Sequence, residues 1–199
     1  MKKVLLAVFL VSCYTVKQAH EDALKHKNNN HVGRVSYTYV MIKPVNSDQL
    51  SYDDSNISAK FIITPKDIDF NIKNITAEPL KIIWDEASIG WMGISHRVIH
   101  AGVRFIDRDK SMPPTIILPN TSIEETTLPS DNVYLQSSYY TSDWSEKPLV
   151  LERITKAKDS TLLNALKGQV LTLYLPIKSQ SDNQIGYTFQ FEISSARIQ

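Results

Sequence analysis

The chain has 199 residues and a formal net charge of +1, because 22 Lys and Arg nearly balance 21 Asp and Glu. This balance excludes the strongly basic surface of a nucleic-acid-binding domain and the polybasic patch that attracts an anionic membrane. The six glycines form no G-x-G-x-x-G, Walker or G-x-S-x-G motif. Neither a Gly-rich phosphate loop nor a nucleophile elbow is therefore expected.

The N-terminal residues have the pattern of a secretory signal. Lys2 and Lys3 give a positive start, and residues 4–11 (VLLAVFLV) are all apolar. A charged start followed by an apolar run of about 7–15 residues is typical of a signal peptide, and the run is shorter than the about 20 residues that span a membrane. An ordinary peptidase site is not found, because a cut after Ser12 would place the large Leu10 at position −3.

The residues Leu10-Val11-Ser12-Cys13 instead resemble the lipobox of bacterial lipoproteins. The resemblance implies a diacylglycerol thioether on Cys13, removal of residues 1–12 as a signal peptide, and a membrane anchor of two or more acyl chains. In Gram-negative lipoproteins an Asp after the cysteine indicates the inner membrane, so Tyr14 implies that the outer membrane is favoured. The alternative is a buried apolar helix with an incidental cysteine, although Cys13 is the only cysteine of the chain.

Residues 13–32 predict a flexible, lipid-anchored tether. They are polar, include Asn28-Asn29-Asn30, and show no sustained hydrophobic period, which is typical of linkers. Residues 33–199 are long enough for one domain with a hydrophobic core.

Within residues 33–199 apolar residues recur mainly at every second position, which predicts β-strands. Residues 68–73 and 80–85 alternate on either side of a turn-rich break, so they are expected to pair as one antiparallel hairpin. The expected strands are residues 34–42, 60–64, 68–73, 80–85, 97–100, 103–106, 122–128, 133–136, 170–177 and 185–193.

One helix is expected, over residues 160–167. Asp159 or Ser160 can cap its N-terminus, a stripe of leucines follows, and Gly168 can end it. The aromatic and polar residues 137–148 are expected to form a loop.

Short antiparallel strands separated by turns predict an all-β fold, an antiparallel β-sandwich. Residues 70–85 (FNIKNITAEPLKIIWD) resemble the Ig-like sandwich domains of envelope lipoproteins and the LEA14-like domains. The resemblance implies an Ig-like sandwich and carries over no functional residue. The Cys…Trp…Cys pattern of disulfide-bonded immunoglobulin domains is missing.

The side chains that could support catalysis or bind metal do not form a set. Ser95 and His96 are adjacent, so in a strand they point to opposite faces. His96 and His100 would lie about 13 Å apart along a strand, too far for one metal, and Asp53-Asp54 and residues 107–110 lack the spacing of a calcium loop. We therefore expect no enzyme, cofactor or metal site; a cleft that joins His96 or His100 to a carboxylate would favour a hydrolase instead.

Tyrosine and tryptophan gather near two segments, residues 86–95 and 134–146. Exposed aromatic side chains are used by protein interfaces and by sugar-binding surfaces; the alternative is that they pack over the ends of the sandwich. The candidate binding residues are Trp84, Trp91, Tyr134, Tyr139, Tyr140 and Trp144.

These patterns predict a membrane-anchored lipoprotein of the cell envelope that binds an envelope protein or supports an assembly. A module that binds carbohydrate or a small ligand through the same aromatic residues is the alternative. The membrane, through the lipid on Cys13, and a protein are the expected partners.

Overall fold

A computed structural model of the chain describes residues 33–137, 142–154, 160–179 and 183–199. The predicted signal peptide, Cys13, the tether, Tyr139 and Tyr140 lie outside these residues. The strands are β1 (Gly33–Lys43), β2 (Ser51–Asp53), β3 (Ile57–Ile63), β4 (Ile68–Asn74), β5 (Leu80–Ile82), β6 (Ser88–Trp91), β7 (Ile94–His100), β8 (Thr115–Ile117), β9 (Ser122–Pro129), β10 (Val133–Ser137), β11 (Ser142–Glu146), β12 (Arg153–Ile154), β13 (Val170–Ser179) and β14 (Gln184–Ile198). The helices are α2 (Ser160–Leu166) and the 3-10 turns η1 (Trp84–Glu86), η2 (Phe105–Asp107) and η3 (Ser130–Asn132).

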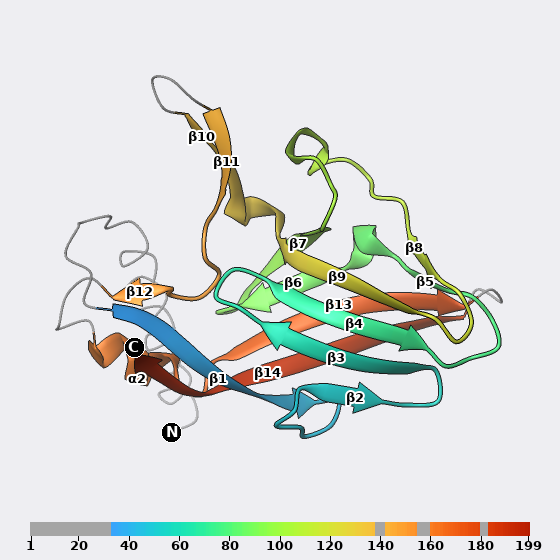
Figure 1. The fold of residues 1–199 in the computed structure, drawn as a ribbon, viewed down its shortest axis with the longest axis horizontal. Coiled ribbons are helices and arrows are strands. Elements are labelled where there is room, and N and C mark those ends of the chain that lie inside the picture. Colours follow the sequence, from blue (N-terminus) through green and yellow to red (C-terminus); the bar gives the residue numbers. More distant parts are fainter. Residues whose placement is uncertain (1–32, 138–141, 155–159, 180–182) are drawn as a thin grey trace, which may run out of the picture.

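Twelve of the described strands form one antiparallel sheet that curls into two layers. Its order is β12-β1-β14-β13-β6-β7-β9-β4-β3-β2, and β5 and β8 join it beside β13. The layer of β9, β4 and β3 lies over β13 and β14 (Figure 1). Strand β7 connects the layers, because its first half pairs with β6 and its last three residues pair with β9. The predicted all-β, sandwich-like fold is confirmed, and one continuous sheet supplies both layers.

The core lies between the layers and is filled by the inward side of each strand. On β4, the buried residues Ile68, Phe70 and Ile72 alternate with more exposed ones. Phe61 on β3 reaches across to Phe189 on β14, with ring centroids 4.5 Å apart. Such alternation explains why the strands could be predicted locally, since a period of two places every second side chain on the same face.

The predicted hairpin of residues 68–73 and 80–85 is wrong. Strand β4 pairs with β3 and β9, whereas β5 pairs with β13 and β8. The chain crosses from one layer to the other at Asn74, whose side chain is fully buried. Its Nδ2 donates hydrogen bonds to the carbonyl oxygens of Glu78 (2.7 Å) and Ile117 (3.0 Å). The buried side-chain amide of Asn74 therefore donates to backbone carbonyl oxygens at a point where a hairpin would have used backbone N–H groups.

Two further expectations differ from the structure. Residues 103–106 do not form a strand, because Asp107 N donates to Arg104 O (2.8 Å) and Arg104 Nε donates to the Asp107 carboxylate (3.0 Å), which closes a local turn. Within the expected loop of residues 137–148, β11 pairs with β10 over five residue pairs. The other predicted strands and the helix are found with shifted ends, and residues 84–85 leave β5 as part of η1.

Asp54 organises the turn between β2 and β3. Its Oδ1 accepts the backbone N–H groups of Asn56 (2.7 Å) and Ile57 (2.8 Å), and its Oδ2 accepts the hydroxyls of Tyr187 (2.9 Å) and Tyr52 (3.1 Å). Burial opposes ionisation of this carboxyl, but the four hydrogen bonds outweigh it and hold the pKa of Asp54 below its ordinary value.

This lowered pKa predicts how stability depends on pH. Asp54 contributes stability that is present above its unfolded pKa, about 3.9, and is lost as the pH falls through the lower folded pKa. We expect Asp54→Asn to be less stable than the parent protein by about 1 kcal/mol near neutral pH, since the site is partly exposed. Urea unfolding in steps from about pH 7 to about pH 3 should show this gap closing; a constant gap contradicts the prediction. Asp53→Asn, a change at the exposed neighbouring residue, is the matched control.

Candidate functional site

The structure buries two of the three tryptophans that were expected to contact a partner, Trp84 and Trp91. Trp84 is 0% exposed and Trp91 is 5% exposed. The Trp84 ring stacks on His100, with centroids 4.4 Å apart, and its Nε1 donates to Thr115 Oγ1 (2.8 Å). Residues 86–95 form β6 and the tight turn to β7. Both side chains are packed in the interior, as the alternative interpretation expected, and neither is available to contact a partner.

The structure brings each histidine of β7 to a carboxylate. His100 Nδ1 lies 3.4 Å from Glu125 Oε2, and both side chains are only 15% exposed. His96 Nδ1 lies 3.4 Å from Asp131 Oδ2 at the surface. In the described residues no Ser, Thr or Cys side chain is hydrogen-bonded to either histidine, and no three His, Cys, Asp or Glu residues converge to hold a metal. His100 Nδ1 is buried and forms no hydrogen bond with a described residue, so His100 and Glu125 are close but not hydrogen-bonded.

The second aromatic segment forms a hairpin that stands away from the sheet. Strands β10 and β11 make a two-stranded sheet of their own, which projects from the body in Figure 1. Leu135 on β10 is 47% exposed and lies opposite Trp144 in the register. Tyr134 is half-buried and has Lys147 Nζ 5.9 Å from its ring centroid.

A hollow of about 550 Å³ lies at the base of this hairpin. Val133 and Glu146 contribute to it from the hairpin, and Val103 and Ile106 from the segment that follows β7. Ile106 is 69% exposed. Two apolar side chains are exposed here, Ile106 and Leu135, whereas Val103 is half-buried and Val133 is buried beneath them in the core. We call the surface defined by Val103, Ile106, Val133 and Leu135 the hairpin face.

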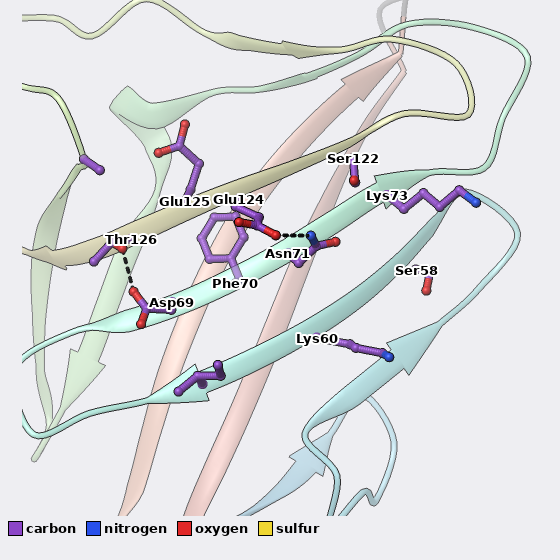
Figure 2. Close-up of a pocket in the computed structure, with 12 residues that line it drawn as sticks. Ser58, Lys60, Asp69, Phe70, Asn71, Lys73, Ser122, Glu124, Glu125 and Thr126 are labelled. Carbon is purple, nitrogen blue, oxygen red and sulfur yellow. Dashed lines mark hydrogen bonds between the residues drawn. The ribbon is translucent and has the colours of Figure 1, made fainter.

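The outer face of β3, β4 and β9 carries an open groove of about 760 Å³, shown in Figure 2. The strand register arranges its outward side chains in three rows. These rows are Ser58, Lys73 and Ser122; Lys60, Asn71 and Glu124; and Ile62, Asp69 and Thr126. We call these nine residues the polar groove.

Two acids of the polar groove are engaged within it, and its two lysines are not. Asn71 Nδ2 donates to Glu124 Oε1 (3.2 Å) and Thr126 Oγ1 donates to Asp69 Oδ1 (2.5 Å). Lys60 and Lys73 are exposed and form no ion pair with another described residue. Glu125 lines the same pocket with a third carboxylate, which lies 3.4 Å from His100 Nδ1. The groove therefore has three carboxylates, each beside a polar partner, and two available ammonium groups.

The sequence did not single out the groove residues. Each occupies the outward position of an alternating strand, which by itself indicates only contact with water. The informative signal was the presence of serine, lysine, asparagine and acids at consecutive outward positions of three strands, but the strand order that joins them is not a local property.

No helix in the described part of the chain combines the length and the apolar character needed to cross a membrane. Comparison of the chain with known protein families, with curated proteins and with solved structures gives no match.

Proposed function

We propose that the chain is a lipoprotein of the cell envelope, anchored through Cys13 and favouring the outer membrane, whose β domain binds a partner protein without catalysing a reaction. The sequence Leu10-Val11-Ser12-Cys13 supports the anchor, and Tyr14 supports the choice of membrane. The polar residues 13–32 would let the domain reach a partner at a distance from the bilayer.

The projecting hairpin is the observation that carries the binding role. An isolated two-stranded hairpin is at best marginally stable in water, yet this one extends from the body with Leu135 exposed. Ile106 adds a second exposed apolar side chain beside the hollow. Neighbouring exposed apolar groups of this kind are typical of surfaces that another protein covers. The partner fitting the hairpin face is an envelope protein with an apolar patch.

Site-specific photocrosslinking in cells tests this role. A photoreactive residue in place of Leu135 should give a crosslink to one defined envelope protein, whereas the same residue in place of Ile185 should not. The two positions are 47% and 42% exposed, so they report on location at matched accessibility. Equal crosslinking at both positions, or none at position 135, contradicts a role for the hairpin face.

The anchor is tested with Cys13→Ala in the same cells. We expect the parent protein in the membrane fraction and the variant in the soluble fraction, because the variant lacks the lipid that holds the chain to a bilayer. The crosslink at position 135 should also be weaker in the Cys13→Ala variant than in the parent protein. A variant that stays in the membrane fraction would contradict lipidation of Cys13.

A further inference from the structure

We infer that the polar groove binds an anionic saccharide, a sugar chain that carries isolated carboxylate or phosphate groups. Ala101 lines both this groove and the hollow at the base of the hairpin, but the polar groove shares no residue with the hairpin face and does not depend on it.

The spacing suits an extended ligand rich in hydroxyl groups. Neighbouring strands lie about 4.8 Å apart, and outward residues on one strand follow each other every 6–7 Å or so. The groove thus offers hydroxyl, amide and carboxylate groups from three strands on a regular grid. Because side chains on strands of a sheet are held more precisely than those on loops, a chain of sugar hydroxyls can meet several partners without ordering the protein first.

The unpaired charges indicate a negative group at one end. Lys60 lies opposite Asn71, and Lys73 lies opposite Ser58, so the lysines are diagonal neighbours about 7–8 Å apart on β3 and β4. Figure 2 shows Ser58 between them. This spacing joins their backbone positions, and the long side chains would let both ammonium groups reach one anion, which would then accept two charge-assisted hydrogen bonds. Ser58 and Ser122 add hydroxyl donors to the row of Lys73.

The acids of the groove exclude dense polyanions. Asp69 lies in the end row away from Lys73, and Glu124 lies in the middle row with Lys60. Asp69 and Glu124 would repel nucleic acid or the surface of an anionic membrane, whereas their oxygens can accept hydrogen bonds from sugar hydroxyls. Ile62, which is 67% exposed, adds apolar contact in the same row as Asp69. The ligand that suits both the lysines and the acids of the groove is a hydroxyl-rich chain with spaced single charges.

Binding of defined oligosaccharides to the full lipidated chain in detergent tests the inference. The probes are a galacturonic acid trimer, its neutral galactose analogue, glucose 6-phosphate and inorganic phosphate, titrated by calorimetry at low salt. We expect the acidic trimer to bind at least about tenfold more tightly than the neutral trimer. Tighter binding of glucose 6-phosphate than of the acidic trimer would assign the anion as a phosphate. Equal binding of both trimers, binding of inorganic phosphate as tight as that of any sugar, or no binding of any probe overturns the inference.

The variant that removes the two cations is Lys60→Gln with Lys73→Gln. Its matched control is Lys43→Gln with Lys167→Gln, which removes two exposed charges away from the groove. We expect about a tenfold loss of acidic trimer binding in the first variant only, with unchanged thermal unfolding in both. An equal loss in both variants would indicate general attraction by net charge and overturn the site. Crosslinking at position 135 should be unaffected in either variant, which separates this test from that of the hairpin face.

Discussion

Replacing Trp84 with alanine should lower the free energy of unfolding by about 3–5 kcal/mol, the range found when a buried aromatic side chain is removed. The indole is 0% exposed and lies between Phe70, with ring centroids 6.4 Å apart, and His100, with centroids 4.4 Å apart. Phe70 comes from β4, in the layer that carries the polar groove, and His100 from the end of β7 that pairs with β9. Urea unfolding followed by circular dichroism measures the change.

Two further variants identify what the Trp84 side chain contributes. Trp84→Phe keeps most of the apolar volume but leaves Thr115 without its donor, so we expect a smaller loss of about 1–2 kcal/mol. Leu135→Ala removes an exposed apolar side chain and should change stability by less than about 0.5 kcal/mol. If Trp84→Ala unfolds like Leu135→Ala, the side chain does not support the core as the structure shows.

Trp84 also illustrates where inference from sequence ends. Leu80, Ile82 and Trp84 share a period of two, and the structure buries all three. The pattern predicted a common face correctly, but an exposed aromatic at an interface and a buried aromatic in a core have the same local sequence. Only the stacking neighbours decide between them, and these come from residues far away in the chain.

The same limit applies to strand pairing. The alternation depends on near neighbours, and the structure shows it in residues 68–73 and in 187–193, whereas Ile185 is exposed. The partner of each strand is set by contacts across the whole chain: β1 pairs with β14, which joins the first described strand to the last. A six-residue connection favoured a hairpin, yet the burial of Asn74 sends the chain to the other layer.

The candidate sites differ in the same way: one depends on a local sequence pattern and the other on contacts between distant residues. The motif at Cys13 is local, so it could be proposed from the sequence, and it remains a proposal. The polar groove exists only because β3, β4 and β9 are neighbours in register. Lys60 and Lys73 are separated by 13 positions in sequence and become diagonal neighbours through that register. A hydrophobic pattern along a single strand cannot predict a surface that several strands form together.

Asn74 sits at the crossing between layers and should be the most sensitive polar residue of the fold. Besides donating to Glu78 O and Ile117 O, its Oδ1 accepts the backbone N–H (2.9 Å) and the hydroxyl (2.8 Å) of Thr76. Its backbone N–H also donates to Thr121 O (2.9 Å), which ties β4 to the start of β9. One residue thus holds the connection between β4 and β5 and the turn between β8 and β9.

Asn74→Ala should therefore lower the free energy of unfolding by about 2–4 kcal/mol, because it removes the side-chain donor to the carbonyl oxygen of the buried Ile117 and the side-chain acceptor of the Thr76 N–H. Asn74→Asp has nearly the same shape but would place a carboxylate against two carbonyl oxygens at a fully buried site, so it should be more damaging than alanine. Asn71→Ala, a change on the outward face of the same strand, should change stability by less than about 1 kcal/mol. In urea unfolding, the loss of stability should decrease in the order Asn74→Asp, Asn74→Ala, Asn71→Ala. Because Asn74→Asp keeps the shape of the side chain, this order would assign the loss to the hydrogen bonds and not to the shape. If Asn74→Asp is as stable as the parent protein, the amide does not donate at this crossing and another feature must separate β5 from β4.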